Sequence, residues 1–186
     1  MKTVIRSACI ASLAALILSG CNVLPEPQKD SVRYFTLSAP PATTVAVADA
    51  TTVRPVQLAG HLRNRAMAVR VGENEVIYLD DTRWAESLGD AITQLLRSRL
   101  SAIGGNHVVT VQIQRCELVR SDNNAVQLAA TYSIVSPGET PAPQRGVFTS
   151  SVRTWDGKNP GALVGLLRDA VVEMSDAIAA ALPEKK

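Results

Sequence analysis

Cysteine, histidine and aromatic residues are scarce in this sequence, and each scarcity excludes a class of protein. The 186 residues include three cysteines, two histidines and only 4% aromatic side chains. His61 and His107 are far apart and no cysteine pair accompanies them, so the spacing of a zinc site is missing. We therefore expect no metal cofactor. The few aromatic rings leave little surface for base stacking, so we expect no nucleic-acid partner either.

Recognisable catalytic motifs are also missing. The chain has no Walker loop, no Gly-x-Ser-x-Gly elbow and no His-Glu-x-x-His. Asp80-Asp81 could act as a carboxylate pair, but at the start of a predicted helix these residues are better explained as capping groups. Gly104-Gly105 follows a predicted helix, which favours a C-cap over a phosphate loop. We therefore expect a protein that is not an enzyme; a serine hydrolase built from scattered residues is the catalytic alternative.

Residues 1–20 have the order of a bacterial export signal. Two basic residues precede an apolar run over residues 8–18. This run is too short for a membrane-spanning helix, which needs ~20 residues, and it fits the central region of a signal peptide. The following Leu18-Ser19-Gly20-Cys21 has the small residues and the cysteine of a lipobox. It predicts cleavage before Cys21 and transfer of diacylglycerol to the thiol; a plain signal followed by a chance cysteine is the alternative.

Lipid on Cys21 predicts a permanent membrane anchor. A mature lipoprotein cysteine carries three acyl chains, and each buried CH₂ contributes ~0.8 kcal/mol. Asn22 stands where an aspartate would favour retention in the inner membrane, so we expect the periplasmic face of the outer membrane. Residues 21–31 contain two prolines and few apolar side chains, which is typical of a tether. Residues 32–186 are then left for a single domain.

The processed chain is electrically neutral and keeps one free cysteine. Cleavage removes Lys2 and Arg6, which leaves seventeen basic residues against seventeen acidic ones. Cys9 leaves with the signal and Cys21 becomes a thioether, so Cys116 remains alone and no intrachain disulfide can form. Cys116 falls inside a predicted strand, where we expect a small buried apolar side chain rather than a reactive thiol.

Alternation of apolar and polar residues predicts a series of strands. In chain order these are 32–37, 45–56, 66–71, 75–79, 107–119, 126–134 and 145–155. Gly72-Glu73-Asn74 is expected to join two of them as a hairpin. Residues 58–63 are expected to form a turn or a short helix.

A first long helix is predicted from Asp81 or Thr82, either of which can act as its N-cap, to Ile103. Trp84 begins an apolar stripe with three- and four-residue steps, the period of an amphipathic helix. Gly104-Gly105 is expected to end it.

A second long helix is predicted from Asn159-Pro160, a cap followed by proline at the first helical position, to Pro183. Both helices have an apolar stripe that needs a covering surface. The fold class that satisfies both is α+β, a two-layer sandwich in which a mostly antiparallel sheet carries the two long helices on one face.

Arg83-Trp84-Ala85-Glu86 is the densest polar and aromatic cluster of the chain. On the predicted helix Trp84 belongs to the apolar stripe, while Arg83 and Glu86 are three residues apart and able to pair. Such a cluster is either a local anchor of the fold or part of an interface, where tryptophan and arginine are favoured. Arg63 and Arg65, just before the predicted hairpin, are candidates for the same surface.

Several segments, taken in order, resemble the PqiC-type family, the auxiliary lipoproteins of ABC-type and MCE-protein transport systems. The segments are Tyr34-Phe35-Thr36-Leu37, residues 53–62, Asn74-Glu75-Val76 and residues 83–88, with the Arg-Trp-Ala-Glu block the most specific. The resemblance covers nearly the whole processed chain. It implies a non-enzymatic lipoprotein of the outer membrane that works with a periplasm-spanning MCE protein in lipid transport and envelope integrity. Ring-like self-assembly is also implied.

Two other non-catalytic roles stay open at this point. A lipid-binding carrier would hold an acyl chain between sheet and helices, in space left by the alanine-rich second helix. An assembly lipoprotein would serve an outer-membrane protein machine, and a neighbouring gene for a large β-barrel would favour it.

Replacement of the lipidated cysteine tests the anchor. We expect radiolabelled palmitate to mark the wild-type chain and not Cys21→Ser, because the thiol is the group that accepts the lipid. Sucrose-gradient fractionation should place the wild type with outer-membrane markers and release the variant. A variant that keeps both its label and its location would contradict the prediction, and co-migration of the wild type with inner-membrane markers would refute the sorting assignment alone.

Overall fold

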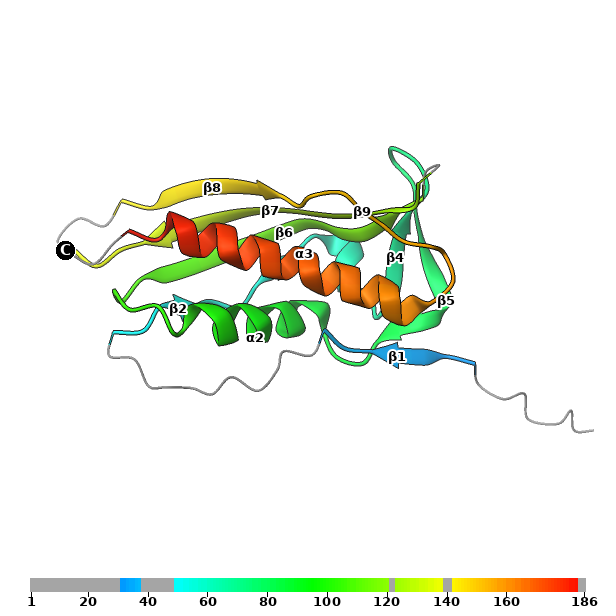
Figure 1. Cartoon of the computed structure of the whole chain (residues 1–186), viewed down its shortest axis with the longest axis horizontal. Coiled ribbons are helices and arrows are strands. Elements are labelled where there is room, and N and C mark those ends of the chain that lie inside the picture. Colours follow the sequence, from blue (N-terminus) through cyan, green and yellow to red (C-terminus); the bar gives the residue numbers. More distant parts are fainter. Residues whose placement is uncertain (1–30, 38–48, 121–122, 139–141, 184–186) are drawn as a thin grey trace, which may run out of the picture. The chain divides into compact units, whose positions relative to one another are not determined.

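One mixed sheet with two α-helices on one of its faces forms the described part of the chain (Figure 1). The computed structural model describes residues 31–37, 49–120, 123–138 and 142–183; the predicted signal peptide and Cys21 lie outside these residues. The elements are β1 (Arg33–Phe35), β2 (Thr52–Val53), β3 (Gln57–Leu58), the 3₁₀ helix η2 (Gly60–Arg63), β4 (Ala66–Arg70), β5 (Val76–Trp84), α2 (Leu88–Leu100), β6 (Val108–Val119), β7 (Ala125–Val135), β8 (Gln144–Thr149), β9 (Arg153–Thr154) and α3 (Pro160–Ala181).

The sheet is built around β6. Its strand order is β1-β5-β4-β6-β7-β8, with β2 and β3 added beside β6 and β9 added beside β7. The long pairings β4–β5, β6–β7 and β7–β8 are antiparallel. The parallel pairings are shorter, and they join β1 to β5 and β2, β3 and β4 to β6. The predicted α+β two-layer sandwich is confirmed, with a mixed sheet whose longest pairings are antiparallel.

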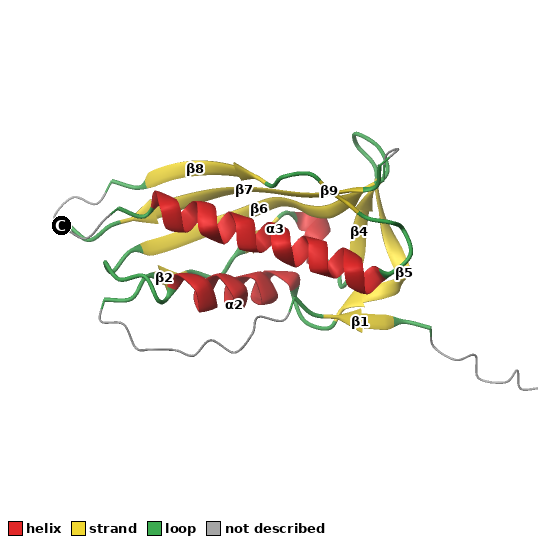
Figure 2. Cartoon of the chain, viewed as in Figure 1, coloured by secondary structure: helices red, strands yellow, loops and turns green. Residues whose placement is uncertain are grey.

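Both helices lie across the same side of the sheet (Figure 2) and bury their apolar stripes there. The fully buried side chains include Ile92 and Leu96 of α2, Leu163 and Leu167 of α3, and Val109, Val111 and Ile113 of β6. Removing this apolar surface from water is the main stabilising contribution, at about 25 cal/mol per Å². None of the helices in the described ranges is both long enough and apolar enough to span a bilayer.

The start of α3 follows the predicted capping pattern. Asn159 is the N-cap, and its side-chain oxygen accepts a hydrogen bond from the backbone N–H of Gly161 at 2.9 Å. Pro160 occupies the first helical position, where its missing N–H costs no hydrogen bond. The helix ends at Ala181, shortly before Pro183.

The first helix begins later than the sequence predicts. Residues 81–84 are the end of β5, and α2 begins only at Leu88, with Ser87 as its N-cap. Asp81 and Thr82 are therefore strand residues, and the prediction that either caps the helix is wrong.

Neighbouring strands explain why residues 81–84 stay extended. β1 pairs with this part of β5, and the backbone N–H of Trp84 donates to the carbonyl of Arg65 at 2.7 Å on the other side. Buried Thr82 and Trp84 alternate with exposed Arg83, which is the period of a strand. Trp84, which ends the strand, and Leu88, which begins the helix, are four residues apart. Their spacing therefore fits the period of a helix although Trp84 is not part of one.

The far end of α2 differs as well. The helix ends at Leu100 with Ser101 as its C-cap, so Ile103 and Gly104-Gly105 lie beyond it. Gly105 has a φ of +109° in the turn that leads into β6. That conformation favours glycine because it has no Cβ, and the glycine pair therefore forms the turn rather than the helix cap.

Two predicted strands are interrupted. Within the described part of 45–56 only β2 is extended in the sheet, and β3 begins after Pro55, which has no N–H for a ladder hydrogen bond. The predicted strand 145–155 is divided into β8 and β9. At the break, the hydroxyl of Ser150 accepts a hydrogen bond from the backbone N–H of Leu128 at 3.1 Å and so replaces part of the ladder.

Cys116 lies on the core side of β6 and is 3% exposed, as the sequence predicts for a small buried side chain. Burial, together with the neighbouring carboxylate of Glu117, raises the pKa of the thiol to about 12. At pH 8 the group is therefore a covered, neutral thiol, whereas the thiolate is the reactive form.

We expect iodoacetamide to leave Cys116 unmodified in native buffer at pH 8 and to alkylate it in guanidinium chloride, as read by mass spectrometry. Equal alkylation rates under both conditions would contradict this burial.

Candidate interaction site

Arg83 and Trp84 point to opposite sides of β5. Trp84 is 3% exposed and belongs to the core, whereas Arg83 is exposed. In the register of β1 with β5, Tyr34 lies directly beside Arg83, and Tyr34 is 56% exposed. The predicted cluster is thus divided into a core anchor and an exposed Tyr–Arg pair.

Arg65 and Glu86 hold this strand end in place. The Nη2 of Arg65 donates to the carbonyl of Ala85 at 2.8 Å, and Thr36 Oγ1 donates to Glu86 Oε1 at 2.9 Å. The predicted Arg83–Glu86 pair is wrong: no ion pair joins these two described residues, because the segment is extended and not helical. Glu86 instead accepts the hydrogen bond from Thr36, in the segment that follows β1.

Arg63 has a separate local role. It ends η2, and its Nε donates to the carbonyl of Leu58 in β3 at 3.3 Å. Arg63 and Arg65 are both exposed and close in sequence, yet they bond to different elements. Of the five predicted residues, Trp84 is buried, Arg65, Glu86 and Arg63 bond within the domain, and Arg83 is exposed beside Tyr34.

Glu117 is a buried carboxylate that the sequence did not single out. It is 0% exposed on β6, where Oε1 accepts from Arg70 Nε at 2.6 Å and Oε2 lies 3.1 Å from His61 Nε2. The hydroxyl of Tyr78 donates to the carbonyl of His61 at 3.0 Å. These bonds hold η2 against the sheet, and they satisfy a buried charge that would otherwise be costly. In the sequence Glu117 is one residue of an alternating strand pattern, and this pattern does not predict that Arg70 and His61 contact it.

His107 lies just before β6 and is buried. Its Nδ1 is 3.0 Å from Ser136 Oγ, while its Nε2 has no hydrogen-bond partner in the described structure. Among the residues that the structure describes, no three His, Cys, Asp or Glu side chains gather to hold a metal ion.

Side chains fill the space between the sheet and the helices. Met174 and Ile178 of α3 and Leu118 and Leu128 of the sheet are fully buried there. Hollows of the described surface include an open one between α2 and α3, lined in part by Arg99 and Asp176. The groups available for contact with a partner are therefore the exposed polar and aromatic side chains of the surface.

Comparison with protein families finds a match over most of the chain. The family described as "ABC-type transport auxiliary lipoprotein component" matches residues 35–179, from the end of β1 to the last turn of α3. None of the curated proteins matches the chain at a significant level.

Two crystal structures share the fold at low sequence identity. One, of an uncharacterized protein, aligns with a TM-score of 0.65 and 15% identity and covers 81% of this chain and 97% of that chain. The other is XCC0632 of Xanthomonas campestris, from the family DUF330, with a TM-score of 0.64, 12% identity and coverage of 79% and 92%. At this identity the likeness is evidence of the fold alone.

Substitution of Trp84 and Arg83 separates the fold anchor from the exposed residue. We expect Trp84→Ala to lower the free energy of unfolding by about 3–5 kcal/mol, because it empties a core position. Arg83→Ala should change that free energy by less than about 0.5 kcal/mol, as is usual for exposed side chains. Urea unfolding followed by circular dichroism measures both, and similar losses for the two variants would mean that Arg83 also supports the fold.

Proposed function

Because this chain belongs to the family of ABC-type transport auxiliary lipoprotein components, we propose that it is the non-catalytic, lipid-anchored subunit of a system that moves lipids between membranes. The family match over residues 35–179 carries this proposal, since it runs from the end of β1 to the last turn of α3. In this role the protein binds partner subunits and supports the integrity of the envelope.

The proposed location is the periplasmic face of the outer membrane. It rests on the lipobox at Cys21 and on Asn22, which replaces the aspartate of inner-membrane retention. The partner in this proposal is a periplasm-spanning MCE protein that connects the lipoprotein to the transporter. A ring of several copies belongs to the same proposal, because the family resemblance implies self-assembly.

Tyr34 and Arg83 are the proposed contact residues. They are adjacent in register, both are exposed, and they lie on β1 and β5, at the start of the domain where the tether joins it. Tyrosine and arginine are favoured at the centres of protein interfaces because each combines a large contact area with hydrogen bonding. Arg65 and Glu86 brace the strand end beneath them.

A lipid carrier has less support than a docking subunit. A carrier needs a deep apolar cavity between sheet and helices, and the described core there is filled by fully buried side chains such as Leu167 and Met174. The alanine-rich end of α3 lies near the surface instead: Ala177, Ala179 and Ala181 are half-buried and Ala180 is exposed.

Purification from cross-linked envelopes tests the proposal. We expect the tagged, lipidated chain to recover an MCE-type protein together with transporter subunits, as identified by mass spectrometry. The double substitution Tyr34→Ala with Arg83→Glu should reduce this recovery several-fold, since hot-spot residues each contribute about 2 kcal/mol or more. Arg168→Glu, a charge reversal at an exposed residue of α3, is the matched control and should leave recovery unchanged.

Repeated recovery of no MCE-type protein from intact envelopes would refute the proposed partnership. Recovery of a large β-barrel in its place would favour the assembly lipoprotein.

A further inference from the structure

The face of the sheet opposite the helices has an unusual chemistry over β6, β7 and β8. Val109, Val111 and Ile113 point into the core, so alternation directs Thr110 and Gln112 to the other side. The ladder pairs these two with Ser133 and Thr131 of β7, which in turn pair with Arg145 and Val147 of β8. We call this side of the three strands the outer face.

Within the described strands, the charged side chains of the outer face that have no ion-pair partner are basic. Glu117 is the one acidic residue that the described registers of β6, β7 and β8 place there, and it is buried and already bonded to Arg70 and His61. Arg145 is exposed, and within the described residues the side chain of Arg115 donates to the neutral side chain of Gln127 at 2.9 Å. The outer face is therefore basic in a processed chain whose net charge is zero.

A row of four residues crosses the sheet and ends in arginine on both sides. Val53 pairs with Val109 and the N–H of Arg54 donates to the Val109 carbonyl, so the register places Arg54 beside Thr110. The row is Arg54, Thr110, Ser133 and Arg145. Adjacent strands are about 4.8 Å apart, so three spacings separate the two arginine backbones by about 14 Å.

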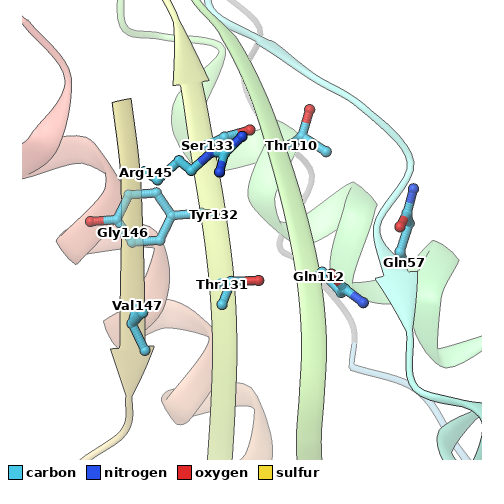
Figure 3. A pocket seen from close by; sticks show the side chains of 9 residues that line it. All are labelled: Gln57, Thr110, Gln112, Thr131, Tyr132, Ser133, Arg145, Gly146 and Val147. Atoms are coloured by element: carbon cyan, nitrogen blue, oxygen red, sulfur yellow. The ribbon is translucent and has the colours of Figure 1, made fainter. Parts of the chain in front are cut away.

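A hollow of about 560 Å³ is lined by Thr110, Ser133 and Arg145 of this row and by residues of the next one (Figure 3). Arg54 lies beside Thr110, outside this lining. Hydroxyl and amide side chains, among them Thr110, Thr131, Gln57 and Gln112, line it, and Arg145 extends from β8 over β7 beside Ser133. These groups can both donate and accept hydrogen bonds. The surface thus combines a neutral hydrogen-bonding floor with a cation at each end of its row.

This chemistry fits a protein segment better than a bilayer or a polysaccharide. A bilayer surface is flat and offers mainly acceptors, whereas the hollow is concave and uses both donors and acceptors. Sugar rings are commonly stacked on aromatic faces, whereas Tyr132 pairs with core-facing Val111 and therefore directs its ring to the helix side of the sheet, over Gly146 of β8. A peptide backbone supplies donors and acceptors in equal number.

We propose that the outer face binds an extended acidic segment of a partner protein, with two carboxylates of the segment on Arg54 and Arg145. An extended chain rises about 3.4 Å per residue, so side chains four residues apart are about 14 Å apart and point to the same side. The segment therefore has the form Glu/Asp-x-x-x-Glu/Asp, and its backbone bonds to the hydroxyl and amide floor. This inference rests on the proposed docking function and identifies the chemistry of the segment that docks.

A defined peptide tests the inference with the full processed, lipidated chain in detergent micelles. The probe is a fluorescein-labelled nine-residue peptide of Thr, Ser and Gln with two glutamates four residues apart. Fluorescence anisotropy should show saturable binding that weakens with salt, because exposed charge contacts are screened. The same peptide with lysines in place of the glutamates should not bind, and one with adjacent glutamates should bind more weakly.

Substitutions then locate the site. Arg145→Glu should weaken binding of the acidic peptide roughly tenfold, since it turns an attractive contact into a repulsive one. Arg145→Gln should weaken it less, and Arg54→Glu should act like Arg145→Glu. Arg168→Glu is the matched control and should bind like the wild type. Thermal unfolding confirms that each variant is folded.

Four outcomes would overturn the inference. In the first the acidic peptide does not bind, and in the second the lysine peptide binds equally well. In the third, Arg54→Glu and Arg145→Glu leave the affinity unchanged. In the fourth, vesicles of phosphatidylglycerol and phosphatidylcholine bind in place of the peptide, and these two substitutions weaken that binding. The envelope purification distinguishes this failure from failure of the proposed function. If the partner is recovered while the peptide does not bind, the docking function stands and the outer face is not its surface. If neither occurs, both are refuted.

Discussion

Strand β6 pairs with β2, β3, β4 and β7, and the alternation of its side chains decides what each face of the sheet can do. Val109, Val111 and Ile113 supply the core with the surface on which the helices pack. A register shift between Ile113 and Arg115 then changes which residues face inward, so that Cys116 and Leu118 continue the core. The same shift turns Glu117 outward, to the side where Arg70 and His61 meet it. Core packing and surface chemistry are therefore two results of one alternating strand.

Long, strongly periodic segments could be predicted from the sequence, whereas junctions could not. The buried stripe of α3 and its Asn159 cap depend on neighbours within a few residues, which sequence patterns record. The end of β5 depends on β1 and on Arg65, which are distant in the chain. Sequence reasoning therefore placed Trp84 on an apolar stripe but assigned that stripe to a helix.

The candidate site shows the same limit. The residues of the Arg83–Glu86 block were identified from composition, but their roles depend on which side of a strand each one occupies. Arg83 and Trp84 are adjacent, yet one is exposed and the other buried. The Glu117 cluster could not be found, because its members come from β6, β4 and η2 and share no spacing. Likewise, the basic row on the outer face exists only through the strand register.

The buried thiol of Cys116 has a consequence for biogenesis. A chain exported as proposed crosses the inner membrane unfolded, so this thiol meets the oxidising catalysts of the periplasm before β6 has partners. Once the strand is paired and the helices cover it, the sulfur is removed from mixed-disulfide chemistry. Folding of the domain then competes with oxidation of the Cys116 sulfur. A copy that folds slowly is exposed for longer to formation of a mixed disulfide with another envelope protein.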